Sequence, residues 1–98
     1  MIEVRQTATF REWFERLRDQ RAQSRIAKRI ANVQAGLLGD VKFFGGIGEL
    51  RIDYGPGYRV YFVQRGAVLV ILLHGGDKNS QARDIGKAKA LADELEDL

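Results

Sequence analysis

Two arginines, two carboxylates and a tyrosine come close together in the segment 49–63, ELRIDYGPGYRVYFV. Its centre, YGPGY, has the glycine and proline residues of a tight turn, and the flanking β-branched and aromatic residues favour strands. We expect Tyr54 and Tyr58 to face each other across this turn. Since side chains alternate along a strand, one face would then carry Glu49, Arg51, Asp53, Arg59 and Tyr61, with Asp53 opposite Arg59 and Arg51 opposite Tyr61. The other face, with Leu50, Ile52, Val60 and Phe62, is predicted to be core.

A basic face that contains a phenol suits the binding of RNA phosphate and cleavage of the backbone without a metal ion. In that reaction the 2′-hydroxyl attacks the adjacent phosphate, two protons move, and charge must be stabilised on a crowded phosphorus. The sequence has one histidine, no cysteine and no carboxylate–histidine spacing typical of a metal site. No metal ion or other cofactor is therefore expected.

Three basic side chains are the candidates for gripping and neutralising the phosphate. Arg59 is the first, because a guanidinium matches phosphate with two parallel hydrogen bonds. Arg51 is predicted to be a second clamp. Lys78, in the loop after the neighbouring strand, is placed to neutralise the transition state or, with its pKa depressed by nearby arginines, to shuttle a proton. The alternative is that both arginines only form cross-strand pairs with Glu49 and Asp53.

Glu49 and His74 are the possible bases, and Tyr61 is predicted to stack on an RNA base or to donate a hydrogen bond. Each base has a structural alternative: Glu49 as the partner of an arginine, and His74 as a hydrogen-bonding residue at the end of a strand. The remaining candidates for RNA binding are basic residues elsewhere in the chain, namely Arg25, Lys28, Arg29 and Lys42. For the three on the predicted second helix, the alternative is a solvated helix face.

The elements that must position these residues follow from hydrophobic periodicity. We predict a strand at 2–5, a helix opened by a capping box at Thr9 and Glu12, a second helix at about 22–37 and a last helix at about 80–95. The aromatic stripe of the first helix (Phe10, Trp13, Phe14, Leu17) and the apolar stripe of the second (Ile26, Ile30, Val33, Leu37) are predicted to be core. The glycine-broken segment 41–48 is expected to be a bent edge strand or a flexible loop, since no strand–loop–helix context supports a phosphate-binding loop.

The strand at 68–73 is apolar on both faces and is expected to be central, covered by the last helix or by a partner protein. If Gln64 and Ala67 flank the preceding turn, Val60 lies opposite Ile71, and Leu72 and His74 share the side of Arg59. The predicted order is β-α-α-β-β-β-α in one domain, residues 1–98. This is an α+β fold, with an antiparallel sheet packed against the two N-terminal helices.

Charge is distributed unevenly along the chain. The net charge is +3, but the last six residues, DELEDL, hold four acids, so residues 1–92 carry sixteen bases against nine acids, or +7. This excess favours a polyanionic partner such as nucleic acid, or alternatively reflects basic residues that solvate helix surfaces. The absence of cysteine, of an N-terminal signal and of an apolar run of ~20 residues predicts a cytoplasmic protein that does not bind membranes.

Several segments together resemble a known family. They are Phe10-x-x-Trp13, Arg25-Ile26, Gly39-Asp40, Glu49-Leu50-Arg51-Ile52, Gly55-Pro56-Gly57-Tyr58-Arg59-Val60-Tyr61-Phe62 and Leu73-x-Gly75-Gly76-Asp77-Lys78-x-x-Gln81. This pattern is similar to the addiction-module killer proteins, HigB-like toxins of the RelE/ParE superfamily in type II toxin–antitoxin modules. The resemblance covers nearly the whole chain.

The resemblance implies a RelE-like fold, an mRNA interferase activity that cleaves messenger RNA on the ribosome, and neutralisation by an antitoxin, usually a small helix-turn-helix protein. Arg59 matches the strand arginine that contacts phosphate in such toxins, and Lys78 falls where the family has another basic or catalytic side chain. The lysine-rich strand and C-terminal catalytic tyrosine of RelE are absent. The alternatives are therefore a ParE-like inhibitor of DNA gyrase, which binds without catalysis, and an inactive corepressor of the antitoxin.

Overall fold

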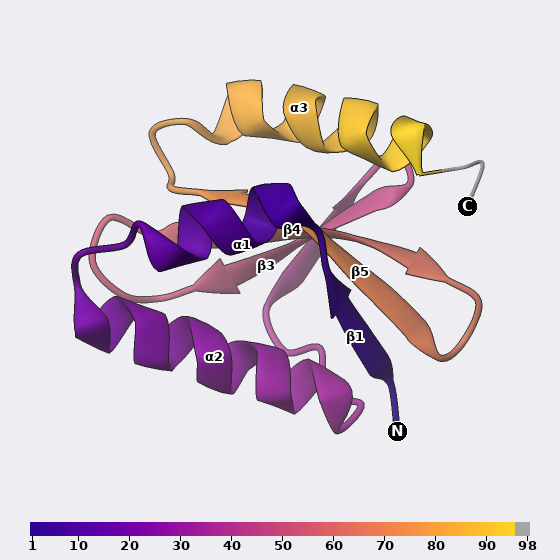
Figure 1. The fold of residues 1–98 in the computed structure, drawn as a ribbon, viewed down its shortest axis with the longest axis horizontal. Coiled ribbons are helices and arrows are strands. Elements are labelled where there is room, and N and C mark those ends of the chain that lie inside the picture. The colour runs from indigo at the N-terminus through magenta and orange to yellow at the C-terminus, as the bar shows by residue number, and fades with distance from the viewer. Residues whose placement is uncertain (96–98) are drawn as a thin grey trace.

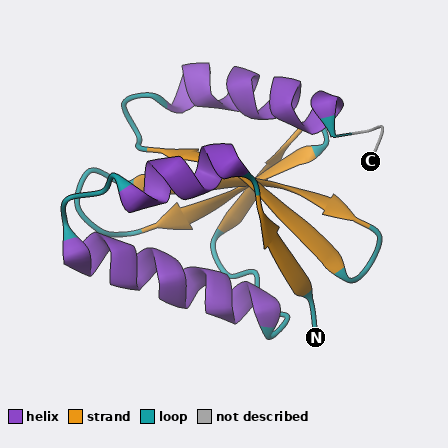
Figure 2. Ribbon diagram, in the orientation of Figure 1, coloured by secondary structure: helices purple, strands orange, loops and turns teal. Residues whose placement is uncertain are grey.

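A computed structural model describes residues 1–95, which fold into one five-stranded sheet between two layers of helix (Figures 1 and 2). The strands are β1 (Glu3–Gln6), β2 (Val41–Phe44), β3 (Ile47–Ile52), β4 (Tyr58–Arg65) and β5 (Leu69–Gly76), in the spatial order β1-β5-β4-β3-β2. The helices are α1 (Ala8–Glu15), α2 (Gln20–Gln34) and α3 (Gln81–Glu94). The α+β class is confirmed, and the architecture is compatible with a RelE-like fold.

The sheet is mixed, where a purely antiparallel one was predicted. β1 runs parallel to β5, and β2 adds an antiparallel edge strand beside β3. Of the two expectations for the segment 41–48, an edge strand or a loop, residues 41–44 form the edge strand, and a turn at Gly45 and Gly46, both with positive φ, leads into β3. Four strands therefore follow α2, where the predicted order had three. None of the helices within residues 1–95 combines the length and apolar character needed to cross a membrane.

Two hydrophobic cores lie on opposite faces of the sheet. α1 and α2 place Phe10, Ile26, Ile30 and Val33 against one face, where the predicted core residues of the hairpin (Leu50, Ile52, Val60, Phe62) are all buried. α3 places Ala88 and Ala92 against the other face, over Ile47, Tyr61, Val63 and Leu73. In Figure 1, α3 runs along the top of the view and α2 along the bottom, with strands between them.

The helix ends differ from the predicted ones in two places. Thr7, rather than Thr9, caps α1: its Oγ1 accepts a hydrogen bond from the Phe10 N–H at 3.1 Å and donates one to the Leu73 carbonyl at 2.9 Å. α2 ends at Gln34, so Leu37 leaves the helical stripe and is 64% exposed, although it was predicted to be buried.

The hairpin pairs with a register two residues away from the predicted one. Arg51 lies opposite Arg59 and Glu49 opposite Tyr61, while Asp53 falls outside the strands and is exposed. Because the shift is an even number, every side chain of the paired strands keeps its predicted face. The longer loop, residues 53–57, accommodates Gly55 and Gly57, which both have positive φ.

The predicted pairing of β4 with β5 is wrong. Val60 lies opposite Gly75 instead of Ile71, and an irregularity between Tyr61 and Phe62 leaves Leu73 as an extra residue on β5. This bulge explains why Leu72 packs on the α1/α2 side while His74, opposite Tyr61, lies on the side of Arg59 as predicted.

Of the two predicted covers for the second face of β5, the last helix and a partner protein, the structure has the helix, α3. It packs over Leu73, whereas Val70 and Leu72 are buried by the first two helices and Val68 is 61% exposed. Of the predicted acidic tail, residues 96–98 lie outside the described residues.

Candidate functional site

Arg51 and Arg59 lie directly opposite each other on β3 and β4, and Gly76 of β5 continues the same row across the sheet. Arg59 is half-buried, and it makes no ion pair with any residue from 1 to 95. Its Nε is buried without a hydrogen-bond partner in that range. The predicted alternative pairing with Asp53 is not formed, so the Arg59 guanidinium retains its capacity to bind an anion.

Glu49 is engaged in structural contacts. It is 0% exposed, and its Oε1 accepts a hydrogen bond from Arg51 Nε at 3.0 Å. Its Oε2 accepts from Gln81 Nε2 of α3 at 2.9 Å. The carboxylate therefore fixes the orientation of Arg51 and attaches the first turn of α3 to β3.

The next row of the sheet is an aromatic pair that α3 covers. Tyr61 and His74 stack with ring centroids 5.8 Å apart and an interplanar angle of 19°. Both are buried, and the Tyr61 hydroxyl has no hydrogen-bond partner in the described part of the chain. Burial, followed by the negative charge of Glu49, raises the pKa of Tyr61. Stacking of an RNA base on Tyr61 requires movement of α3.

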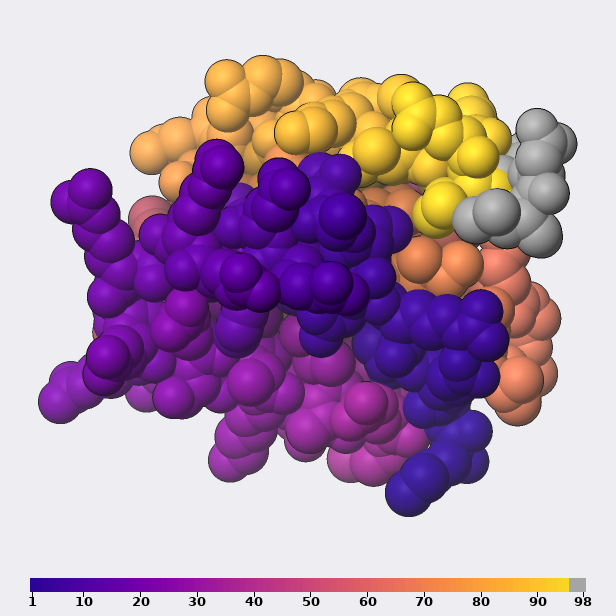
Figure 3. All heavy atoms as spheres, in the orientation of Figure 1, coloured from indigo at the N-terminus to yellow at the C-terminus, as the bar shows by residue number. Residues whose placement is uncertain are grey.

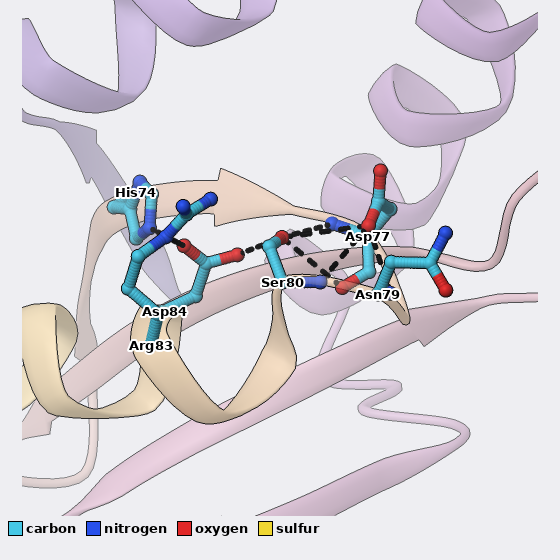
Figure 4. A network of polar contacts seen from close by, with 6 residues as sticks. All are labelled: His74, Asp77, Asn79, Ser80, Arg83 and Asp84. Carbon is cyan, nitrogen blue, oxygen red and sulfur yellow. Dashed lines mark hydrogen bonds and ion pairs between the residues drawn. The ribbon is translucent and has the colours of Figure 1, made fainter.

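His74 belongs to a polar network at the start of α3 (Figure 4). Its Nε2 lies 3.0 Å from Asp84 Oδ1, and the other carboxylate oxygen of Asp84 accepts a very short hydrogen bond from Ser80 Oγ. Burial lowers the pKa of His74, and the hydrogen bond with Asp84 opposes this shift. The neutral ring therefore donates from Nε2 to the carboxylate and keeps a lone pair on Nδ1.

Two glycines let helices from both layers approach β5. A Cβ on Gly75 would lie 2.3 Å from the Trp13 ring, and one on Gly76 would collide with the Asp84 carboxylate. The loop between β5 and α3 is closed by Asp77 Oδ1, which accepts hydrogen bonds from the Asn79 and Ser80 N–H groups at 2.9 and 3.1 Å.

Lys78 lies at the same end of the sheet as Arg59. Its N–H donates to the Pro56 carbonyl at 3.4 Å, which joins the β5–α3 loop to the β3–β4 turn. Its side chain is exposed. The structure therefore brings Arg51, Arg59 and Lys78 to one end of three neighbouring strands.

The other basic candidates lie elsewhere. α2 packs on the opposite face of the sheet from α3, and from it Arg25 stacks over the Tyr54 ring at 4.8 Å. Arg29 donates to the carbonyls of Arg51 and Asp40, and Lys28 is exposed. Lys42, on the edge strand β2, lies 5.2 Å from the Phe44 ring. The three α2 residues thus lie on the other side of the sheet from Arg59, whereas Lys42 lies opposite Glu49 and shares the face of Arg59, with β3 between their strands.

Sequence reasoning quoted Gln81 only as a motif residue and missed its contact with Glu49, and it missed Asp84 altogether. A signal was available for Asp84. It lies four and eight residues before Ala88 and Ala92, and so falls within the apolar stripe of the helix, where a carboxylate is buried only with a partner.

The chain matches known proteins over most of its length. Residues 12–95 match the family model described as "Phage derived protein Gp49-like (DUF891)". A protein of Haemophilus influenzae strain Rd, described as an uncharacterized protein, is 50% identical over 95 residues, which cover 96% of each chain. No solved structure matches the chain.

Proposed function

Because the chain belongs to the Gp49-like family, a toxin-like family of toxin–antitoxin systems, we propose that it is a toxin that cleaves messenger RNA on the ribosome. An antitoxin partner is implied by the family in general. We further propose that this antitoxin is a small helix-turn-helix protein and that the toxin acts in the cytoplasm, where its target is.

The observation that carries the proposal is the unpaired guanidinium of Arg59 beside Arg51. Two arginines on adjacent strands would repel each other without an anion, and only Arg51 has a carboxylate partner among the described residues. A phosphate diester that binds Arg59 would supply the missing negative charge, with two hydrogen bonds to the guanidinium.

In this proposal Arg59, Arg51 and Lys78 have separate roles in in-line cleavage. Arg59 holds the scissile phosphate, and the 2′-hydroxyl gives its proton to solvent water as its oxygen attacks the phosphorus and the 5′-oxygen leaves. Arg51, oriented by Glu49, offsets the charge that develops on the phosphate. Lys78 adds a mobile positive charge at the open end of the site, where it stabilises the leaving oxygen and can protonate it. Glu49 acts through Arg51, as a positioning residue.

The test is primer extension on a reporter message after induction of the protein in cells, with the Arg59→Ala variant in parallel. Loss of one charge-stabilising donor is expected to reduce cleavage by about 100-fold or more. Arg21→Ala, which removes an exposed arginine of α2, is the matched control and should cleave like the wild type. Unchanged cut sites in both Arg59→Ala and Lys78→Ala would refute the assignment.

A second candidate is inhibition of DNA gyrase by binding alone. The burial of Glu49 and His74 beneath α3 favours it, because neither predicted base is open to a substrate in this conformation. Growth arrest that persists in both variants and changes plasmid supercoiling would support this function. Absence of any growth effect would favour an inactive corepressor.

A further inference from the structure

A cavity of about 500 Å³ opens at the end of β5, between α1, the β3–β4 turn and the first turns of α3. β1 pairs only with Leu69–Leu72, so the outer edge of β5 beyond Leu72 has no strand beside it within residues 1–95. α1 and α3 lie on either side of this edge, and they are neighbours on the surface in Figure 3. The volume lies in the range of small-ligand sites.

The two walls of this cleft differ in chemistry. On one side the Trp13 indole and the Tyr58 phenol meet edge to face, with centroids 6.2 Å apart, and Leu17 lies beside them. On the other side α3 contributes the exposed cations Arg83 and Lys87. An aromatic wall that faces two positive charges is complementary to a ligand with an aromatic ring at one end and an anion at the other.

His74 lines the cleft between these walls. Its Nε2 is hydrogen-bonded to Asp84, whereas Nδ1 has no hydrogen-bond partner in the described part of the chain. Figure 4 shows the imidazole held by Asp84, with the Arg83 guanidinium beside it. Burial keeps the ring neutral, and so Nδ1 is an acceptor for an N–H or O–H of a ligand.

We propose that this cleft binds one nucleotide of single-stranded RNA, with the base against Trp13 and Tyr58, the phosphate on Arg83 and Lys87, and a ligand donor on His74 Nδ1. The choice of RNA rests on the proposed function, in which the cleft would hold a nucleotide next to the phosphate at Arg59. An acidic peptide would use the cations alone. The aromatic wall and the single acceptor nitrogen favour a nucleotide.

The experiment uses two reporters that the chain provides. Its only tryptophan and its only histidine both line the cleft. The four ribonucleoside 5′-monophosphates are titrated into the intact protein, while Trp13 fluorescence and the imidazole NMR signals of His74 are recorded. Inorganic phosphate and a glutamate-rich peptide are titrated in parallel.

At least one nucleotide should change both signals in a saturable way. The Arg83→Gln/Lys87→Gln variant should weaken its binding by about tenfold or more, which corresponds to the loss of a charge-assisted contact. The matched control, Arg21→Gln/Lys89→Gln, removes one arginine and one lysine outside the cleft and should bind within about twofold of the wild type.

Three results would overturn the proposal: no nucleotide response at either reporter, equal binding of inorganic phosphate, or binding of the peptide in place of nucleotides. The outcome is separable from that of the cleavage test. Nucleotide binding without mRNA cleavage would refute the proposed function and support the nucleotide site in the cleft. Cleavage without nucleotide binding would support the proposed function and refute the nucleotide site.

Discussion

Gly75→Ala tests the packing that forms one wall of the cleft. The added Cβ would lie 2.3–2.4 Å from three carbon atoms of the Trp13 ring, about an ångström inside ordinary contact. The indole cannot retreat alone, because it packs against Phe10 and Tyr58 at centroid distances of 5.8 and 6.2 Å. Overpacking of this kind costs about 1–3 kcal/mol. We expect the free energy of unfolding to fall by that amount.

Equilibrium urea denaturation, followed by circular dichroism, measures the effect. For a domain of this size each kcal/mol lowers Tm by roughly 4–8 °C, so thermal unfolding gives a second measurement. Gly86→Ala is the control, since nothing lies within 4 Å of a Cβ at this exposed position of α3. Alanine is favoured over glycine in a helix, and this variant should gain up to about 1 kcal/mol.

A double-mutant cycle locates the cause. If the Cβ–indole overlap is responsible, Gly75→Ala should cost less in a Trp13→Leu background than in the wild type, because the smaller side chain leaves room. Wild-type stability of Gly75→Ala, or a cost that is the same in both backgrounds, would refute the reasoning.

Three further predictions concern single side chains. Thr7→Ala should cost about 1–2 kcal/mol in urea denaturation, because it removes the α1 cap and the bond to Leu73, whereas Thr7→Ser should retain most of the stability. Since the pKa of His74 is lowered in the folded state, stability should fall as pH drops below about 6.5, where the unfolded chain takes up the proton first. If His74→Gln makes stability independent of pH in this range, His74 is the responsible group. If the variant keeps the pH dependence of the wild type, His74 is excluded. Tyr61→Phe removes a buried hydroxyl that lacks a partner among the described residues, so stability at neutral pH should stay the same or rise by up to about 1 kcal/mol. The wild type should lose stability above pH ~10 because the pKa of Tyr61 is raised in the folded state, and the variant should not show this loss. A marked loss of stability of the variant at neutral pH would contradict this account.

Local pattern in the sequence was enough to sort the side chains of the hairpin. Alternation assigns Glu49, Arg51, Arg59 and Tyr61 to one face, and the structure confirms this even though the register differs by two residues. Helical periodicity likewise predicts the buried stripe of α2, in which Ile26, Ile30 and Val33 are core residues. The direction of a side chain depends on the local backbone, and it repeats every two residues in a strand and every 3.6 residues in a helix.

Tertiary structure decided between the two predicted covers of that face, the last helix and a partner protein. The sequence does not say that α3 lies over the row of Glu49, Tyr61 and His74, because Gln81 reaches Glu49 across 32 residues and the bulge at Leu73 depends on pairing between strands. Burial turned the two predicted bases, Glu49 and His74, into members of polar networks and left the hydroxyl of Tyr61 without a partner in the described chain. Arg59 likewise stayed without a partner among these residues. The physical reason is that exposure and charge pairing depend on contacts between distant segments, whereas the local chain determines only the direction in which each side chain points.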